Sequence, residues 1–264
     1  MPNFDAGRVH CKSTLQLRNS KPEFNWWLNK GNLIDSSILA GHWEPVSTWA
    51  CERWVKPGMF CLDIGANIGY YTVLLSYLAG PTGCVIGVEP MGDACRVAEQ
   101  HVALNNLDAA VFQLALSDRL QTVADGFFNY AWPPNDCTQK RCTYEETTLD
   151  AWLTKDAGRP VHFIKIDVDG YEFKLLRGAE ETLKRDKPIL LLEVCDYTLR
   201  AAAGLISDRS YKPNSQTRLM LEYLQELGYL FYREEDDTPL MSLDEVLAIR
   251  DLSISSINIL CHAQ

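Results

Sequence analysis

The chain has 264 residues, 47% of them hydrophobic, which is enough to bury the core of one large α/β domain. Its 25 basic and 35 acidic residues give a net charge of −10 without a long basic run, so the composition disfavours a nucleic-acid substrate. Because the longest apolar run is too short to cross a bilayer and the N-terminus has no apolar signal core, we expect no membrane anchor.

Nine cysteines are an odd number, and five of them lie in or beside apolar runs where free thiols pack as small hydrophobic groups. These are Cys61, Cys84, Cys95, Cys195 and Cys261. Cys137 and Cys142 are closely spaced, but no second pair or nearby histidine completes a tetrahedral zinc site. We therefore expect reduced thiols and a cytoplasmic location.

The first 43 residues mix polar segments with the aromatic cluster FNWWL, and we expect either a cap over a cofactor or an arm on the sheet. Trp26, Trp27 and Trp43 either line the mouth of a substrate site or serve as packing anchors. From Glu44 to Val55 the apolar spacing predicts a lead-in helix just before the first strand of the sheet.

The stretch FCLDIGANIG, from Phe60 to Gly69, predicts a buried parallel strand, a tight loop and a helix that begins near Gly69. Gly65 lets the backbone turn sharply and approach a ligand, and Gly69 lets the helix pack against the strand. Dinucleotide enzymes usually show GxGxxG, whereas here Ala66 replaces the second glycine and Asp63 precedes the first. The loop is therefore a poor site for a pyrophosphate.

S-adenosylmethionine (AdoMet) carries positive charge but no phosphate, so its site needs close backbone approach and a carboxylate. The glycine turn with its preceding acid supplies both, although a turn of this kind also occurs in other α/β domains. The next strand, CVIGVE, ends in Glu89, where an acid can accept both ribose hydroxyls. We predict cofactor contacts from Asp63, Gly65, Ala66, Asn67, Gly69, Tyr70, Glu89 and Pro90.

A helix from Asp93 to Asn105 and a third strand, AAVFQLAL, come next, and the alternation predicts a parallel sheet with right-handed crossovers. Ligands of such sheets bind at the carboxyl ends of the strands, where Asp63, Glu89 and the pair Ser117 and Asp118 are expected. Ser117 or Asp118 either meets the adenine edge of the cofactor or belongs to an ordinary turn.

Residues 119–146 break the pattern, with the run GFFNY followed by AWPPNDCTQKRCTYEE. This stretch is too irregular for a core element, so we interpret it as a long loop and a candidate substrate lid. A helix then opens at TLDAWL, capped by Thr147 or Thr148.

The stretch VHFIKIDVDGYEFKLLRGAEETL predicts a fourth buried strand, a turn and a helix. Lys165, Asp167 and Asp169 lie on one side of the strand if its extended geometry persists. Gly170 allows the turn, and Glu172 starts a helix with a single apolar stripe. His162 is interpreted as a core residue of the strand.

Three further strands and a helix are predicted towards the C-terminus. PILLLEV is a fifth strand that ends at Glu193, TRLMLEYLQELGY is an amphipathic helix, and YLFYR and SSINILCHA are the last strands. Between Cys195 and Gln216 we expect either a substrate-facing loop or a plain connector. Neither His101 nor His262 is a persuasive catalyst.

Several of these segments together resemble the FkbM-type AdoMet-dependent methyltransferases: LDIGANIGYYT, VEP, ALSD, TLDAWL, IKIDVDGYEFKLLRGA and LLLEV, in this order. The resemblance implies a Rossmann-like class I methyltransferase fold over residues 44–264. This α/β fold has helices on both faces of a seven-stranded, mostly parallel sheet of order 3-2-1-4-5-7-6 with an antiparallel last strand. It also implies methyl transfer from AdoMet to a hydroxyl of a sugar or natural-product scaffold. The family typically reads IDVEGxE, so Asp169 is one methylene shorter here.

Methyl transfer from a sulfonium is an in-line displacement, so the enzyme mainly positions the acceptor oxygen and removes its proton. The candidate bases lie near the ends of the fourth and fifth strands: Asp167, Asp169, Glu172 and Glu193, with Lys165 beside them. Structural alternatives exist, because Glu172 favours a helix N-terminus, Asp169 shapes the turn, and Glu193 can pair with Lys165. We favour Asp167 and Glu193 as the functional pair, and Asp167 is also predicted to contact the cofactor.

An alternative is a Mg²⁺ site formed by Asp167, Glu193 and Asp196, in which the metal lowers the pKa of the acceptor hydroxyl. The resemblance does not require a metal. Two other classes stay open, a nicotinamide oxidoreductase, which should show GxGxxG, and a non-catalytic AdoMet-binding domain. We expect a small-molecule or glycan hydroxyl as the acceptor, and the oligomeric state stays open, a dimer included.

Overall fold

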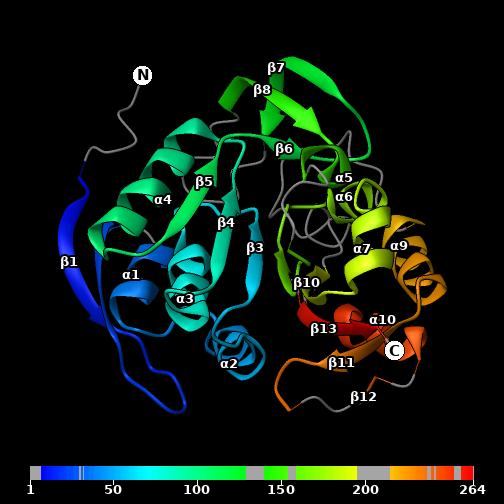
Figure 1. The fold of residues 1–264 in the computed structure, drawn as a ribbon, viewed down its shortest axis with the longest axis horizontal. Helices are drawn as coiled ribbons and strands as arrows, with labels where there is room; N and C mark the ends of the chain where they lie inside the picture. The colour runs from blue at the N-terminus through cyan, green and yellow to red at the C-terminus, as the bar shows by residue number, and fades with distance from the viewer. Residues whose placement is uncertain are drawn as a thin grey trace. The chain divides into compact units, whose positions relative to one another are not determined.

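The computed structural model describes residues 7–29, 31, 33–128, 140–153, 159–194, 215–236, 239–240, 242–252 and 257–263 (Figure 1). The chain divides into two compact units. Unit 1 comprises Met1–Ala115 with Thr122–Glu145, and unit 2 comprises Leu116–Gln121 with Glu146–Gln264. Within the described residues, no helix has the length and apolar character needed to cross a membrane.

The sheet of unit 1 contains three parallel strands in the order β5-β4-β3. These are β3 (Phe60–Ile64), β4 (Cys84–Val88) and β5 (Ala109–Phe112). All five residues of β3 are buried, as expected for a strand covered on both faces. The helices α3 (Tyr70–Ala79) and α4 (Gly92–Leu104) connect the strands and lie beside them in Figure 1. The predicted alternation and strand order are confirmed for this part of the chain.

The third strand is shorter than predicted, and this changes the surroundings of Ser117. β5 ends at Phe112, and Ala115 begins β6 (Ala115–Leu116), which belongs to a separate three-stranded sheet of order β6-β8-β7. The backbone N–H of Leu114 donates to the carbonyl of Phe112 at 3.1 Å. Since this tight local bond turns the chain, one strand over AAVFQLAL cannot form. We had predicted that Ser117 follows the end of the third parallel strand, and the structure shows that it does not.

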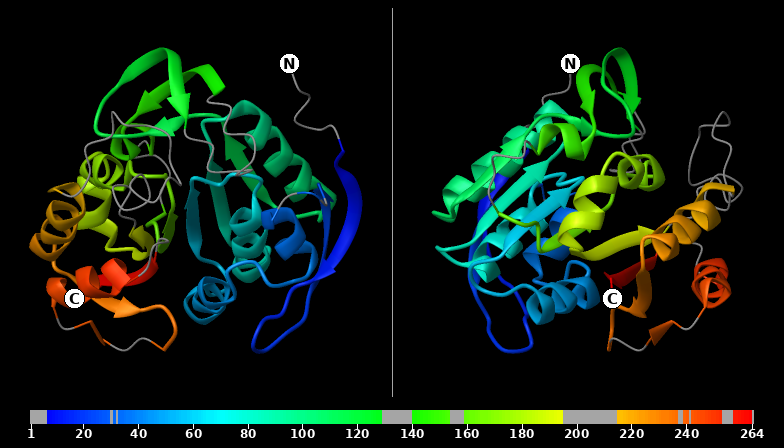
Figure 2. Two further views of the ribbon diagram at one scale, coloured as in Figure 1. Left: turned by 180° about the vertical axis from the view of Figure 1, so that it is seen from behind. Right: turned by 45° about the vertical axis from the view of Figure 1, so that its right-hand side comes forward.

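The N-terminal residues form an antiparallel hairpin of β1 (Val9–Thr14) and β2 (Glu23–Leu28), followed by α1 (Leu33–Leu39) and α2 (Pro45–Trp54). In β2, the buried residues Phe24, Trp26 and Leu28 alternate with more exposed ones, as one buried face of a strand requires. Figures 1 and 2 show the hairpin in blue beside α4. The lead-in helix over residues 44–55 is confirmed as α2.

Trp26 is a packing anchor, whereas its neighbour Trp27 is partly exposed. The indole of Trp26 is 1% exposed, donates from Nε1 to Ser13 Oγ at 3.0 Å and stacks on Tyr70 with ring centroids 6.0 Å apart. Trp27 is 37% exposed. Trp26 is therefore a packing anchor, because its contacts cover nearly all of its surface.

Side chains of α4 close the free edge of β2. Asn105, just after α4, accepts the N–H of Asn25 at 2.7 Å and donates to the carbonyl of Asn25 at 2.9 Å. One turn earlier, His101 Nε2 accepts the N–H of Trp27 at 2.8 Å. An open strand edge leaves backbone groups unpaired, so these two side chains, spaced i and i+4, replace a neighbouring strand.

The stretch from 119 to 146 is more regular than predicted. It contains β7 (Gln121–Phe128) and most of β8 (Lys140–Thr147), which belong to the three-stranded sheet. The prediction of one long irregular loop is therefore wrong for these strands. Cys137 and the prolines of AWPPND lie outside the described residues, as does the side chain of Cys142. A lid function of this segment stays a prediction.

The sheet of unit 2 has the order β9-β10-β13-β11-β12. Its strands are β9 (Phe163–Ile166), β10 (Ile189–Val194), β11 (Tyr229–Arg233), β12 (Pro239–Leu240) and β13 (Ile257–Ala263). β9 and β10 are parallel, whereas β13 is antiparallel to both β10 and β11. This is the predicted order of the fourth, fifth, seventh and sixth strands, with the short β12 added at the edge.

The helix predicted after Gly170 is two helices, α6 (Glu172–Arg177) and α7 (Glu180–Asp186). The interruption between the two helices is bound by α5 (Leu149–Trp152), because the Asp150 N–H donates to the Gly178 carbonyl at 3.0 Å. The Asp150 carboxylate also accepts the N–H groups of Glu181 and Thr182, both at 2.9 Å. Asp150 thus caps α7 and replaces the helical bonds that one continuous helix would make.

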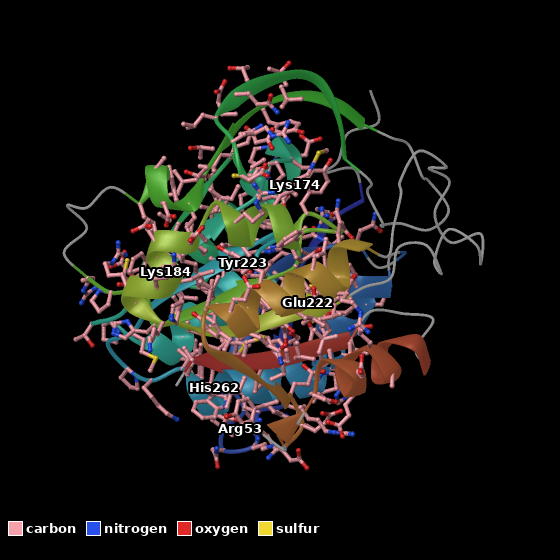
Figure 3. All side chains as sticks on the ribbon, turned by 90° about the vertical axis from the view of Figure 1, so that its right-hand side faces the viewer. Arg53, Lys174, Lys184, Glu222, Tyr223 and His262 are labelled. Carbon is pink, nitrogen blue, oxygen red and sulfur yellow. The ribbon has the colours of Figure 1, made fainter. Side chains whose placement is uncertain are left out.

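Two more helices complete unit 2, the predicted α9 (Ser215–Glu226) and α10 (Leu243–Leu252), which we had not predicted. Figure 3 labels Tyr223 on α9 and Lys184 on α7. The ring of Tyr223 contacts Phe173 of α6 edge-on, with centroids 5.9 Å apart. In α5, Thr148 is the predicted cap, since its Oγ1 accepts the N–H of Ala151 at 3.1 Å.

Candidate functional site

The glycine turn after β3 is held by left-handed backbone conformations. Gly65, Asn67 and Gly69 have φ angles of 86°, 49° and 84°. The N–H groups of Gly65 and Ala66 donate to the carbonyl of Val88 at 2.9 and 3.0 Å. Since glycine adopts positive φ without steric cost, the two glycines allow the turn to remain next to the end of β4.

Gly69 also brings α3 close to α4. A Cβ atom at Gly69 would lie 2.8 Å from the Cβ and 2.9 Å from the Cα of Ala98. The predicted packing role of Gly69 therefore has a structural basis, but the contact is with the next helix. Side chains are excluded at this position by both the φ angle and the neighbour.

Glu89, at the end of β4, binds backbone groups with both carboxylate oxygens. Oε2 accepts the N–H of Asn67 at 2.8 Å, and Oε1 accepts the N–H of Met91 at 2.9 Å. The side chain is 7% exposed. Each carboxylate oxygen can accept a further hydrogen bond, so Glu89 is able both to fix the glycine turn and to receive ribose hydroxyls. Pro90, which follows it, accepts from Gln113 Nε2 at 3.3 Å through its carbonyl.

Asp63 is buried beneath the turn. Its side chain is 1% exposed, and Oδ2 accepts the hydroxyl hydrogen of Thr72 at 2.5 Å. Thr72 lies on α3, so this bond joins the strand before the turn to the helix after it. Hydrogen bonds to an ionised acceptor are among the strong ones, and this contact orients the Asp63 carboxylate. A contact between Asp63 and the cofactor stays a prediction.

Tyr70, the first residue of α3, is a buried residue of the same region. Its hydroxyl lies 2.9 Å from Thr48 Oγ1 and 3.3 Å from the carbonyl of Trp43. The next residue, Tyr71, donates its hydroxyl hydrogen to Glu44 Oε2 at 2.6 Å. Burial raises the pKa values of both phenols, so both stay protonated at neutral pH. Ala66 is likewise buried, at 5% exposure.

His101 is a residue of this site that sequence reasoning missed. Its ring is fully buried, with Nδ1 2.7 Å from the carbonyl of Ile68 in the glycine turn. A signal was present in the sequence, because His101 continues the buried stripe of Ala94, Val97 and Ala98 on α4. A polar side chain on a buried helix face must find hydrogen-bond partners, and here one partner is the turn itself.

Ser117 and Asp118 are held by unit 2. Ser117 is 1% exposed, and its N–H donates to the carbonyl of Thr147 at 2.8 Å. Its own carbonyl approaches Gly178 so closely that a Cβ there would lie 1.9 Å away. Asp118 pairs with Arg119 and Arg177 at 3.3 and 3.6 Å. These contacts support the turn interpretation, and a contact with adenine stays a prediction.

The carboxylates after β9 and β10 belong to unit 2. Lys165 is 1% exposed, and its Nζ lies 3.1 Å from Oδ2 of Asp167, whose side chain is 33% exposed. Lys165 is level with Leu191 in the parallel register of β9 and β10. The paired register ends at Ile166 and Leu192, and Asp167 and Glu193 are the next residues of the two segments. The structure thus pairs Lys165 with Asp167, and a pairing of Lys165 with Glu193 stays a prediction.

Asp169 and Glu172 form the turn between β9 and α6. Oε1 of Glu172 accepts the N–H groups of Val168 and Gly170 at 3.2 and 3.0 Å. Asp169 has a left-handed φ of 51°, so the extended geometry has ended and Asp169 does not continue the alternation of Lys165 and Asp167. Burial raises the pKa of Glu172 to about 7, against the effect of the Gly170 N–H. Glu172 therefore holds the turn through its side chain and also begins α6, the helix N-terminus that its structural alternative stated.

A metal site is not defined by the part of the chain that the structure describes. Among those residues, no group of three or more His, Cys, Asp or Glu side chains is placed to hold an ion. Asp196, one of the three alternative Mg²⁺ ligands, lies outside the described residues. Within the described part of the chain, no disulfide is formed by Cys11, Cys51, Cys61, Cys84, Cys95 or Cys261.

Comparison with known proteins identifies the family of this chain. Residues 63–231 match the family model "Methyltransferase FkbM domain", which is more than half of the chain. A protein-L-isoaspartate O-methyltransferase of Triticum aestivum is 26% identical over 99 residues, 38% of this chain and 41% of that protein. Protein-L-isoaspartate O-methyltransferase 1 of Arabidopsis thaliana is 38% identical over 53 residues, 20% of this chain and 23% of that protein. The chain thus spans less than half the length of these curated relatives.

A crystal structure of a methyltransferase FkbM from Methylobacillus flagellatus KT is similar at a TM-score of 0.46 and 13% identity. That similarity covers 78% of this chain and 44% of the other. The matched family segment begins at Asp63, before the glycine turn, and includes Glu89 and the carboxylates after β9 and β10. The chain therefore belongs to the FkbM methyltransferase domain family.

Proposed function

We propose that the protein transfers a methyl group from AdoMet to a hydroxyl of a sugar, glycan or natural-product acceptor. The observation that carries this proposal is the Glu89 carboxylate beside a glycine turn built from left-handed residues at the end of β3. The turn allows close backbone approach, and the carboxylate is an acceptor for two ribose hydroxyls. Membership of the FkbM family supports the same donor.

The chemistry of the strand ends supports a hydroxyl acceptor. The Asp167 side chain is 33% exposed, whereas Glu172 and Glu193 are 6% and 7% exposed, and the ammonium of Lys165 lies 3.1 Å from the Asp167 carboxylate. An alcohol is a weak nucleophile, so a positioned carboxylate that removes its proton assists the displacement. The names of the two curated relatives, both O-methyltransferases, support an oxygen acceptor.

The base proposed here is Asp167, with Glu193 as its partner on the neighbouring strand. The proton passes from the acceptor hydroxyl to the carboxylate while the oxygen attacks the methyl carbon and the thioether leaves. Glu172 is not the base in this proposal, because its Oε1 is engaged by two backbone N–H groups and its side chain is 6% exposed. Its role is to hold the turn.

Binding of the donor tests the first half of the proposal. Titration calorimetry with AdoMet, S-adenosylhomocysteine and NAD should show binding of the first two and none of the third. Transfer of a labelled methyl group should then be measured with sugars, glycans, small alcohols, aryl scaffolds and an isoaspartyl peptide. Binding of NAD alone would point to an oxidoreductase, and AdoMet binding without transfer to any acceptor would favour a non-catalytic domain.

The base is tested by Asp167→Asn. We expect kcat to fall by about 10²- to 10⁴-fold, the usual contribution of a general base. AdoMet affinity should change by about twofold or less if the cofactor contact of Asp167 is minor. Asp244→Asn, which removes an exposed charge on α10, is the matched control. An unchanged kcat in Asp167→Asn together with a large loss in Glu193→Gln would assign the proton transfer to Glu193.

A further inference from the structure

His101 connects the glycine turn to the N-terminal hairpin through one imidazole ring. Nδ1 lies 2.7 Å from the carbonyl oxygen of Ile68, which is in the turn. On the other side of the ring, Nε2 lies 2.8 Å from the backbone nitrogen of Trp27 in β2. The ring is fully buried, so these contacts are shielded from water.

The two partners determine the protonation of the ring. A carbonyl oxygen only accepts, so Nδ1 carries a hydrogen and donates it to Ile68. A backbone N–H only donates, so Nε2 is unprotonated and accepts from Trp27. The ring is therefore neutral and in its Nδ1–H tautomer. The carbonyl of Trp27 is 3.2 Å from Nε2 and accepts a bond from Arg8 at 2.9 Å.

The contact with Ile68 supplements the other bonds of the turn. Asn67 is held by Glu89, and the N–H of Gly69 donates to the carbonyl of Ala66 at 2.7 Å. Ile68 lies between them, and its carbonyl belongs to the peptide unit that includes the N–H of Gly69. Fixing that carbonyl fixes the orientation of the whole peptide plane at the start of α3.

We infer that His101 is a positioning residue for the AdoMet site, which sets the peptide plane between Ile68 and Gly69 and couples it to the strand edge at Trp27. This inference rests on the proposed function, since it assumes that the turn binds the donor. Its consequence is that donor binding and the hairpin are energetically linked. Such coupling is reciprocal, so what stabilises one also stabilises the other.

Two variants test the contacts of the two ring nitrogens separately. In His101→Asn, the amide nitrogen can take the place of Nδ1 and donate to Ile68, but the shorter side chain does not reach Trp27. In His101→Gln, the longer amide can reach Trp27 but does not place a donor at Ile68. Each variant loses one buried hydrogen bond, so a purely structural role predicts similar losses in both.

Calorimetric titration with S-adenosylhomocysteine provides the test, with circular dichroism to confirm folding. We expect His101→Asn to bind within about threefold of the wild type and His101→Gln to bind about tenfold more weakly, since only the latter loses the turn contact. Equal affinities of the two folded variants would overturn the inference alone. A wild-type protein that does not bind would overturn the proposed function, and the inference would fail with it.

A second measurement uses the wild-type protein and needs no variant to fold. Nitrogen-15 spectra of His101 should show a hydrogen on Nδ1 and none on Nε2. Saturation with S-adenosylhomocysteine should slow hydrogen exchange of the Trp27 amide more than that of the Asn25 amide, which is bound to Asn105 instead. The opposite tautomer, or equal slowing of the two amides, would contradict the inference.

Discussion

The Oε2 atom of Glu89 accepts the backbone N–H of Asn67 at 2.8 Å, which ties the end of β4 to the glycine turn after β3. The other oxygen of the same carboxylate accepts the N–H of Met91 at 2.9 Å. One side chain thus organises two backbone segments on adjacent parallel strands. Both segments follow the carboxyl ends of strands. The site therefore lies at the edge of the sheet where α/β proteins bind ligands.

Replacement of Glu89 tests whether this carboxylate receives the donor. In Glu89→Gln, one carboxylate oxygen becomes an amide nitrogen that donates, so one of the two backbone hydrogen bonds and part of the proposed ribose contact are lost. We expect AdoMet affinity to fall by about 10- to 100-fold in calorimetric titrations. Glu99→Gln on the exposed face of α4 removes the same charge and should leave affinity unchanged. Equal affinities of the two variants would show that Glu89 does not bind the donor.

Substitution of Gly69 tests the packing of the turn against α4. Gly69→Ala places a Cβ 2.8 Å from the Cβ of Ala98 at a φ of 84°, so both strain and overlap oppose the change. We expect the free energy of unfolding to fall by about 2 to 4 kcal/mol in urea titrations. Gly228→Ala has a similar φ of 86° but no atom within 4 Å, and should cost only about 1 to 2 kcal/mol. Similar losses in both variants would mean that α3 and α4 adjust without cost.

The neutral state of His101 predicts an acid-sensitive stability. Burial, together with the charge of Arg8, lowers the pKa of His101 from 6.5 to about 4, although the bond that its ring donates to the Ile68 carbonyl opposes this. The unfolded chain therefore binds a proton between pH 6.5 and 4 that the folded chain does not. The contribution of His101 to the free energy of unfolding is complete above pH 6.5. It falls by about 3 kcal/mol as the pH drops towards 4.

Urea titrations of His101→Asn between pH 4 and 7 measure this contribution. The variant should lose less stability than the wild type as the pH falls, because it has no imidazole to protonate. His42→Asn, at an exposed histidine, is the control and should follow the wild-type curve. Parallel curves for the wild type and His101→Asn would show that His101 titrates alike in the folded and unfolded chains.

Glu172 predicts the opposite dependence. Its folded pKa of about 7, raised above 4.5 mainly by burial, means that the folded chain holds a proton that the unfolded chain releases between these values. Its contribution is fully present below pH 4.5 and is lost as the pH rises through 7, by about 3 kcal/mol. Glu172→Gln keeps an oxygen for the Val168 and Gly170 N–H groups but cannot ionise.

We therefore expect Glu172→Gln to match the wild type near pH 5 and to exceed its free energy of unfolding near pH 8. Urea titrations at the two pH values provide the measurement. Glu181→Gln, at an exposed position of α7, removes one negative charge and should show no such difference. If Glu172→Gln is less stable than the wild type at pH 8, the carboxylate is ionised in the folded protein and its turn contacts outweigh burial.

Local patterns in the sequence were sufficient for β3, α3, β4 and α4, because apolar runs, glycines and helical periodicity act within a few residues. The same holds for Glu89 at the end of β4, since the end of a buried strand is visible as a change from apolar to charged residues. Membership of the FkbM family could likewise be predicted from the order of short segments. These features depend on neighbours in the chain.

What only the tertiary structure decided depends on partners far apart in the chain. Trp27 and His101 are 74 residues apart, and Asp150 caps α7 from 31 residues away, so no local pattern predicts either bond. The strands β7 and β8 were missed because their pairing joins separate segments of the chain, whereas β5 ends early through the local bond between Leu114 and Phe112. A buried polar group must be satisfied by whichever partner the fold brings to it, and that choice is made by packing of the whole chain.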